Sequence, residues 1–282
     1  MKIFHWVIYA LVSLAVLSSG SPIAQITAPP PRVSVLLYHR FSETVTGSTT
    51  VKTSVFAEQL AWLVAHRVAV VPLHTLVDGL VRGQLPGDGP VVALTADDGH
   101  PSVYSDMYPL IRQYQVPVTL FIYPEGIANF DDALTWAQLA EMIGSGLVDV
   151  QSHSYSHPNF RTAERRLGPA AYEDFVKREL GLSKTRLETQ LGIKVDLFAW
   201  PYAICDAMLE RHAAEAGYVA AFSVERRPLL VGQNLYALPR YMITNADRGA
   251  QLAELVFGAS AEVTGRMAAC ETGDSAAALQ DQ

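Results

Sequence analysis

Residues 91–100 read VVALTADDGH, an apolar run that leads into two adjacent aspartates, Asp97 and Asp98. The run Val91–Leu94 is typical of a buried β-strand, because it is short, apolar and rich in β-branched residues. A turn needs at most one Asp before its Gly. Two neighbouring carboxylates repel each other, so one of them is expected to be neutral or bound to a cation. The stretch therefore indicates a core strand that ends in a chemically active pair.

Strand-like and helix-like segments alternate along the chain on both sides of this stretch. We expect strands at 33–38, 68–71, 91–94, 118–122, 147–150, 195–199, 219–223 and 236–243. We expect helices at 54–66, 74–82, 101–114, 135–144, 170–191, 206–216 and 246–257. Such alternation predicts an α/β fold with a parallel sheet. Seven or eight units in about 225 residues favour a barrel over an open sheet.

The two ends of the chain differ from this central region. Residues 1–24 combine Lys2, an apolar core and small residues, which indicates a signal peptide or an uncleaved N-terminal anchor. Residues 25–32 form a Pro-rich linker, 33–258 the folded domain, and 259–282 a flexible tail with few large apolar residues. We therefore expect an exported protein, periplasmic or extracellular, with membrane contact only through a retained N-terminal segment.

The overall composition narrows the choice of partners. The chain has 21 Lys and Arg against 28 Asp and Glu, a net charge of −7, and a nucleic-acid partner would require a basic face. We therefore expect no nucleic-acid partner. The two cysteines, Cys205 and Cys270, do not make a disulfide framework. They could pair in an oxidising compartment, although Cys270 lies in the predicted tail.

Polar residues follow several predicted strands at the end of the barrel where reactive groups of such folds lie. The first strand ends in Tyr38-His39, the fifth runs into His153-Ser154-Tyr155-Ser156-His157, and the sixth ends in Trp200-Pro201-Tyr202. Each motif alone has an ordinary explanation as a turn, a surface histidine pair or core packing. Together, one carboxylate and two imidazoles make a three-ligand site with room for water, as in catalytic zinc centres. The second carboxylate could then act as a base, and a separate histidine as an acid.

With T-A-D-D-G at 95–99, H-S-Y-S-H at 153–157 and F-A-W-P-Y at 198–202, the chain resembles the polysaccharide deacetylases of carbohydrate esterase family 4, the NodB-homology domain. The resemblance covers most of residues 33–245. It implies a distorted (β/α)7–8 barrel, formed by a single domain, that removes N- or O-acetyl groups from sugar polymers with a divalent metal. It implies Asp97 as the catalytic base and the backbone N–H of Tyr202 as a donor to the oxyanion. The implied metal ligands are Asp98, His153 and His157.

The chain departs from many members of this family at two positions. In many members the third motif carries an arginine that orients the base, and a late leucine–histidine motif supplies the general acid. Here Ala199 stands where that arginine would be, and no histidine follows His212. The last predicted strand contains Arg240 instead, which could replace the missing arginine. We place Arg240 with Tyr202 among the residues that bind the oxyanion or the substrate.

The sequence is similar to the subgroup that deacetylates poly-β-1,6-N-acetylglucosamine in biofilm matrices. In that subgroup an early Tyr-His supplies the general acid, and L-L-Y-H-R-F at 36–41 fits, so the resemblance gives this role to His39. W-P-Y at 200–202 is also similar, and we add Trp200 to the oxyanion- or substrate-binding residues. The resemblance supplies no role for His100.

The expected function is that of a metal-dependent hydrolase that cleaves amide bonds and releases acetate from an N-acetylglucosamine-containing exopolysaccharide. The expected cofactor is Zn²⁺, with Co²⁺ or Ni²⁺ as alternatives, because a His/His/Asp set accepts several divalent ions. Two other readings stay open. One is a different acetylated glycan, such as chitin oligomers, peptidoglycan or an O-acetylated polymer. The other is a non-catalytic glycan-binding protein with a relic site.

Overall fold

The strand that begins at Val91 is β5 (Val91–Asp97), and it ends three residues beyond the predicted end at Leu94. In this computed structural model, which describes residues 32–44, 47–86, 89–127 and 129–258, β5 is the longest described strand. It pairs in parallel with β1 (Val33–Tyr38), β4 (Ala69–Val70) and β6 (Val118–Ile122). The first aspartate of the pair therefore belongs to the strand, and only the second belongs to the turn.

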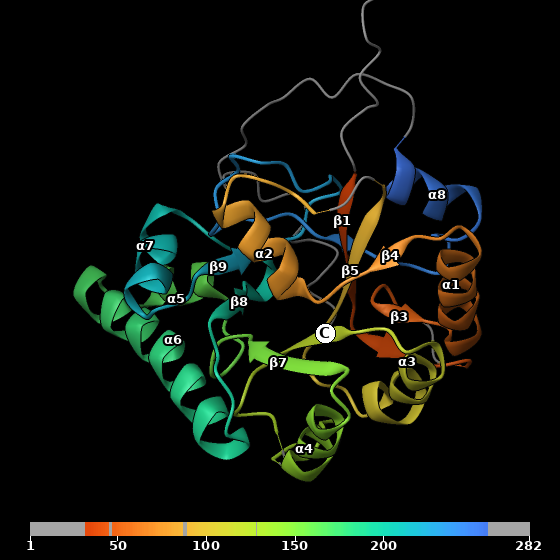
Figure 1. The fold of residues 1–282 in the computed structure, drawn as a ribbon. Coiled ribbons are helices and arrows are strands. Elements are labelled where there is room, and N and C mark those ends of the chain that lie inside the picture. Colours follow the sequence, from red (N-terminus) through yellow and green to blue (C-terminus); the bar gives the residue numbers. More distant parts are fainter. Residues whose placement is uncertain (1–31, 45–46, 87–88, 128, 259–282) are drawn as a thin grey trace, which may run out of the picture. The chain divides into compact units, whose positions relative to one another are not determined.

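The sheet has the order β10-β1-β5-β6-β7-β8-β9, with β4 beside β5, and every pair in it is parallel. The remaining strands are β7 (Val148–Ser152), β8 (Leu197–Ala199), β9 (Ala220–Phe222) and β10 (Tyr241–Met242). The two end strands, β9 and β10, do not pair with each other within the described residues. The sheet curls with helices around it (Figure 1). The expected distorted (β/α) barrel is confirmed, as a curled sheet without full closure.

Helices fill the connections between these strands. They are α1 (Thr53–Ala65), α2 (Leu73–Val81), α3 (Tyr108–Tyr114), α4 (Trp136–Gly144), α5 (Phe160–Arg166), α6 (Pro169–Leu191), α7 (Ala207–Glu215) and α8 (Ala250–Phe257). Two short helices are also present, the π-helix η1 (Val103–Met107) and the 3₁₀-helix η2 (Pro201–Ala203). A small separate sheet consists of β2 (Arg40–Phe41) and β3 (Thr50–Val51).

Some elements differ between the prediction and the structure. Helix α5 is absent from the prediction, because its seven residues carry three arginines and too few apolar residues to show a helical period. The first half of the predicted helix at 101–114 is the π-helix η1. Of the predicted strand at 236–243, only Tyr241–Met242 pairs with β1. A Pro at 239 cannot donate to a ladder, which accounts for the shortened strand.

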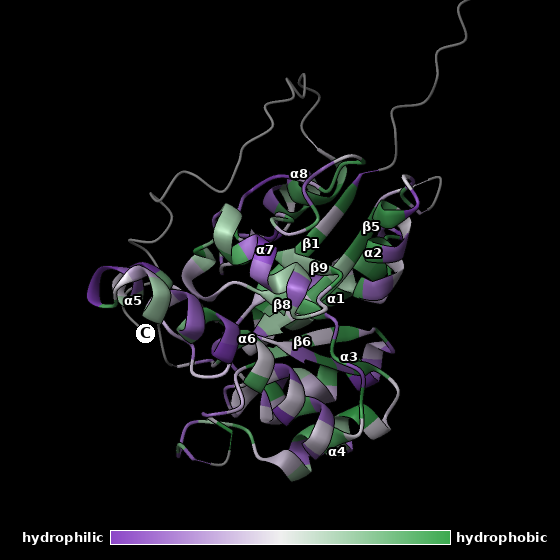
Figure 2. Cartoon of the chain, turned by 90° about the vertical axis from the view of Figure 1, so that its left-hand side faces the viewer, coloured by the Kyte–Doolittle hydropathy of each residue, from purple (hydrophilic) through white to green (hydrophobic). Residues whose placement is uncertain are grey.

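Alternate residues of the strands form the barrel interior, and α2 covers its amino-terminal end. Apolar side chains from β1, β5, β6, β8 and β9 form one cluster with Leu73, Leu76, Val77 and Leu80 of α2. The strands of this core are apolar along most of their length, whereas the helices around it carry polar residues (Figure 2). In β5 the inward positions are Val91, Ala93, Thr95 and Asp97, by the two-residue period of a strand. Asp97 therefore points into the barrel at the opposite, carboxyl end.

Several predictions fall outside the described residues. The predicted signal peptide or anchor at 1–24, the linker at 25–32 apart from Arg32, and the tail at 259–282 are not described and stay predictions. Cys205 is buried and is not a free thiol, whereas Cys270 lies outside the described residues. None of the helices in the described part is long and apolar enough to cross a membrane.

A cluster of ion pairs connects α2 with the sheet at the amino-terminal end of the barrel. The Nδ1 atom of His74 lies 3.3 Å from Oδ2 of Asp149, and its Nε2 atom lies 2.7 Å from Oδ1 of Asp196. Lys194 Nζ lies 2.6 Å from the other oxygen of Asp196. Hydrogen bonds to Asp149 and Asp196 raise the pKa of His74 to about 10. The protonated imidazole therefore joins α2 to Asp149 of β7 and to Asp196, the residue before β8.

Substituting His74→Gln should make the domain less stable in a pH-dependent way. The raised folded-state pKa means that the charged pair stabilises fully below the unfolded pKa of about 6.5 and stops stabilising as pH rises through about 10. The difference in unfolding free energy should be about 1 kcal/mol near pH 6, given the partial exposure of His74, and should shrink toward zero by pH 10. Denaturant unfolding of both proteins at several pH values measures it, and a difference independent of pH would contradict the assignment.

Candidate active site

The ends of β5, β7 and β8 meet at the carboxyl end of the barrel, and their turns have unusual backbone geometry. Asp98 has φ of 71°, and Gly99 follows with φ of 82°. A Cβ at Gly99 would lie 2.9 Å from Cδ1 of Ile122, so only glycine fits at this turn. Of the seven described non-glycine residues with positive φ, five lie in these turns: Asp98, Ser154, His157, Tyr202 and Ala203. Such strain concentrates at functional sites, because the surrounding structure must hold it.

Asp98, His153 and His157 form a cluster that fits a metal ion. Their nearest donor atoms all lie within 4.8 Å of one another, and Oδ1 of Asp98 is 3.5 Å from the Nε2 atoms of both histidines. That Oδ1 atom is buried and has no hydrogen-bond partner in the described residues. A buried carboxylate oxygen without a partner is costly, and a bound cation would satisfy it. The three residues therefore fit the sequence-based ligand set for a divalent ion.

Asp98 and His157 have protonation states that suit metal ligands, whereas the pKa of His153 is raised, because the lowering effect of burial is outweighed by Asp97 and Asp98. His153 Nδ1 lies 2.7 Å from the carbonyl oxygen of Ala199 and donates to it, which leaves the Nε2 lone pair directed toward Asp98. Burial lowers the pKa of His157 to about 4, so its imidazole is neutral near pH 7. Burial alone would raise the pKa of Asp98, but the neighbouring imidazole of His153, 3.5 Å from Oδ1, keeps it below its usual range. An anionic carboxylate and neutral imidazoles are the forms that bind metal.

The loop between the two histidines is held by a buried glutamate of α6. Glu179 is 3% exposed, and its Oε2 atom accepts hydrogen bonds from the backbone N–H groups of Tyr155 at 3.1 Å and Ser156 at 2.8 Å. The Ser156 hydroxyl donates to the other oxygen at 2.9 Å. Glu179 therefore positions the loop that carries both His153 and His157. No local sequence pattern marks Glu179, because only the packing of α6 brings residue 179 next to this loop.

Asp97 forms a bidentate ion pair with Arg240 at the back of the site. Arg240 donates from Nη1 and Nη2 to the two carboxylate oxygens at 2.7 Å each, and neither side chain is more than 2% exposed. Burial would raise the pKa of Asp97, but the charge of Arg240 holds it below its usual value. Asp97 is therefore an anion of fixed orientation. Arg240 lies behind this carboxylate and is fully buried, so the structure places it away from the cavity surface where substrate would bind.

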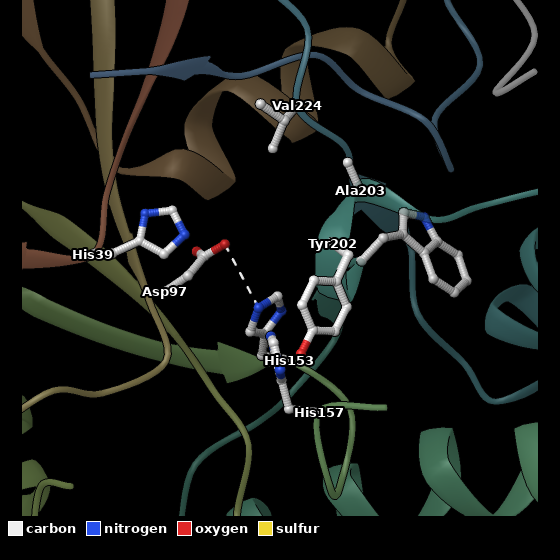
Figure 3. Close-up of a pocket in the computed structure, with 8 residues that line it drawn as sticks. His39, Asp97, His153, His157, Tyr202, Ala203 and Val224 are labelled. Atoms are coloured by element: carbon white, nitrogen blue, oxygen red, sulfur yellow. Dashed lines mark ion pairs between the residues drawn. The ribbon is translucent and has the colours of Figure 1, made fainter. Parts of the chain in front are cut away.

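A small cavity of about 10 Å³, with room for about one water molecule, opens beside these groups. Its lining residues are His39, Asp97, His153, His157, Trp200, Tyr202, Ala203 and Val224. Figure 3 shows His39 and Asp97 together at one wall and Tyr202 and Ala203 at the opposite wall, with the two ligand histidines between them. Burial lowers the pKa of His39, against the raising effect of the nearby aspartates. The Asp97 carboxylate and the His39 imidazole therefore face the same small space.

Trp200 and Tyr202 complete the opposite wall. Trp200 is buried and its Nε1 atom donates to the carbonyl oxygen of Tyr236 at 2.9 Å, which holds the indole in place as an apolar surface. Tyr202 has φ of 55°, and its ring centroid lies 4.7 Å from that of His157. Within the part of the chain that the structure describes, its backbone N–H donates no hydrogen bond. This N–H is therefore available to a ligand.

Comparison with known proteins agrees with this arrangement. A family model for polysaccharide deacetylases matches residues 84–221. The chain is 25% identical over 199 residues to a poly-β-1,6-N-acetyl-D-glucosamine N-deacetylase of Staphylococcus aureus, covering 69% of this chain and 68% of that protein. The structure of IcaB from Ammonifex degensii aligns with a TM-score of 0.69 at 25% identity, covering 80% of this chain and 97% of that one. A deacetylase PplD from Streptococcus pyogenes, solved with acetate, aligns with a TM-score of 0.72 at 22% identity over 81% and 99% of the two chains.

Substituting Glu179→Gln should weaken metal binding without unfolding the domain. The amide has one acceptor oxygen in place of two, so the loop that carries His153 and His157 is less well held. The affinity for Co²⁺ or Zn²⁺ should fall about tenfold, the usual effect of losing a group that supports metal ligands. Titration of the metal-free protein with Co²⁺, followed by its visible absorption, measures this. Asp174→Asn, at an exposed position on the same helix, is the matched control, and equal affinities of the two variants would contradict the positioning role.

Proposed function

Because the chain belongs to the polysaccharide deacetylase family, we propose that it is a metal-dependent hydrolase that removes N-acetyl groups from poly-β-1,6-N-acetylglucosamine and releases acetate. One observation carries the proposal. Two adjacent carboxylates at the end of β5 have different partners, since Asp97 is paired with Arg240 and Asp98 faces two imidazoles. This difference separates a proton acceptor from a metal ligand. The curated relatives named for this substrate support the choice of glycan.

The metal would be held by Asp98, His153 and His157, the three residues that the cluster brings together. A divalent ion there would supply Lewis acidity toward the acetyl carbonyl and lower the pKa of a water molecule. We propose Zn²⁺ as the native ion, with Co²⁺ or Ni²⁺ able to replace it, because neither ion size nor a mixed N/O ligand set excludes them.

Side chains and a backbone N–H of this chain would carry out the proton transfers and bind the oxyanion. Asp97 is ionised and oriented by Arg240, so it can take the proton of the attacking water. The N–H of Tyr202 would donate to the oxyanion that develops on the acetyl oxygen. His39 would donate a proton to the sugar nitrogen as the C–N bond breaks. Since burial lowers its pKa, its protonated form is a stronger acid than an exposed imidazolium.

The apolar wall of the small cavity suits the methyl group of an acetamide. Trp200, Ala203 and Val224 line it, and none of the three offers a charge to the cavity. The products would be acetate and a glucosamine unit. We also propose that the protein is exported to the periplasm or the extracellular space, with a retained N-terminal segment as its only membrane contact.

Substitutions of the proposed base and acid should abolish most of the activity and leave the metal in place. Asp97→Asn and His39→Ala should each lower kcat for acetate release from poly-β-1,6-N-acetylglucosamine by about a hundredfold or more, because each removes one proton transfer. Metal content by elemental analysis should equal that of the wild type, since neither residue belongs to the ligand set. Activity of either variant within threefold of wild type would rule out its assigned role.

Removal of the metal should stop acetate release, and its return should restore it. Treatment with a chelator, followed by separate addition of Zn²⁺, Co²⁺ or Ni²⁺, identifies the ions that support activity. A panel of β-1,6-linked N-acetylglucosamine polymer, chitin oligomers, peptidoglycan and an O-acetylated polymer tests the substrate. We expect the highest kcat/KM for the β-1,6-linked polymer. Full activity in the presence of the chelator, or a clear preference for another glycan, would overturn the proposal.

A further inference from the structure

A second cavity, of about 200 Å³, lies beside the ligand set. It is lined by Arg40, Asp98, His100, Tyr123, Asp132, His157 and Tyr202. His157 and Tyr202 also line the small cavity, so these two side chains form the partition between the two spaces. All the lining residues of the second cavity carry polar groups, whereas the small cavity has an apolar wall. The two spaces therefore suit different parts of one substrate.

His100 presents a fixed hydrogen-bond donor at this second cavity. Its Nδ1 atom accepts from the backbone N–H of Ser102 at 3.2 Å and lies 2.8 Å from the hydroxyl oxygen of the same residue. That hydroxyl oxygen accepts from the N–H of Phe41 at 2.8 Å, so its own proton is directed to His100. Since Nδ1 accepts, the ring proton resides on Nε2. Nε2 has no hydrogen-bond partner among the described residues, which leaves this N–H for a ligand.

Arg40 is a second donor and lies at the start of β2, directly after His39. Its side chain is half-buried, and its Nε atom is buried without a hydrogen-bond partner in the described part of the chain. No carboxylate among the described residues forms an ion pair with it. A half-buried guanidinium without an acceptor is uncommon, because each unmade hydrogen bond costs free energy. An oxygen-rich ligand in this cavity would supply the missing acceptors.

The ring of Tyr123 lies at the cavity and occupies space that is free only because residue 126 is a glycine. A Cβ atom at Gly126 would lie 2.4 Å from Cε2 of Tyr123, so any other residue would displace the ring. The ring centroid of Tyr123 lies 5.3 Å from that of His157. Asp132 adds an acceptor to the same wall. The cavity thus offers donors from Arg40, His100 and Tyr123 and one carboxylate acceptor, a combination that matches the hydroxyl groups of a neutral sugar.

We propose that this cavity binds the sugar ring that carries the reacting acetamide, and that Arg40 and His100 donate hydrogen bonds to its neutral oxygens. The assignment rests on the proposed function, because it places the methyl group of the acetamide against the small cavity and the sugar ring across the His157–Tyr202 partition. It gives His100 a role in binding the substrate rather than in proton transfer. The two residues determine how well a sugar amide is accepted in comparison with an acetyl compound that has no sugar.

The test compares two substrates in variants of these residues. The substrates are a β-1,6-linked N-acetylglucosamine pentasaccharide and 4-nitrophenyl acetate, which has an acetyl group but no sugar. In Arg40→Ala and in His100→Ala, kcat/KM for the pentasaccharide should fall about tenfold or more, mainly through KM. The ratio of this kcat/KM to that for the ester should fall by nearly the same factor. Arg40→Lys, which keeps the charge but loses the planar group, should lower the ratio less than Arg40→Ala.

Controls separate this proposal from effects on the metal and from the proposed function. Arg82→Ala, at an exposed position that follows α2, should leave the ratio unchanged. Metal content of each variant should match the wild type. If a variant is active and the ratio of the two kcat/KM values is unchanged, or if kcat/KM falls equally for both substrates, the proposed role of the second cavity is wrong. The proposed function would be unaffected by that result. A wild-type protein that hydrolyses the ester but releases no acetate from the pentasaccharide would overturn the proposed function, and this inference with it.

Discussion

Two carboxylates that are adjacent in sequence and buried together require two separate positive partners. Leaving either one unpaired in this environment would cost several kcal/mol, because an ion removed from water loses its hydration. Asp97 is compensated by the guanidinium of Arg240, which makes two hydrogen bonds of 2.7 Å. Asp98 has a buried oxygen without a hydrogen-bond partner in the described residues, next to two imidazoles. The division into an oriented carboxylate and a candidate cation site follows from this requirement.

The surrounding structure keeps the two aspartates and the two histidines in their positions. Asp98 has a left-handed backbone conformation, and Gly99 makes the turn possible against Ile122. Glu179 of α6 fixes the loop of the two histidines from below. At the other end of the barrel, α2 covers the apolar interior and is attached through His74. The carboxyl end of the barrel can therefore carry strained turns, while the amino-terminal end supplies packing and ion pairs.

The local sequence patterns were sufficient for most of the elements. Strand β6, at Val118–Ile122, coincides with its prediction, and the capping box of Thr135 and Gln138 begins α4 as expected from the spacing. The exceptions are segments whose structure depends on distant partners. Helix α5 is short and charged, and it is capped by Asn159 directly after the histidine loop. The late strand exists only where Tyr241 and Met242 meet β1.

By itself, the sequence determined the α/β barrel and the motifs at its strand ends, because hydrophobic period and strand-terminal polar residues are local properties. It also placed Asp97, Asp98, His39 and the two histidines at one end of the barrel. Tyr123 follows β6 at that same end and could have been found by the same rule. Only the tertiary structure decided that Arg240 lies behind Asp97, and that Glu179 supports the loop. Those contacts join residues more than twenty positions apart, and they depend on how the sheet curls, which no local pattern encodes.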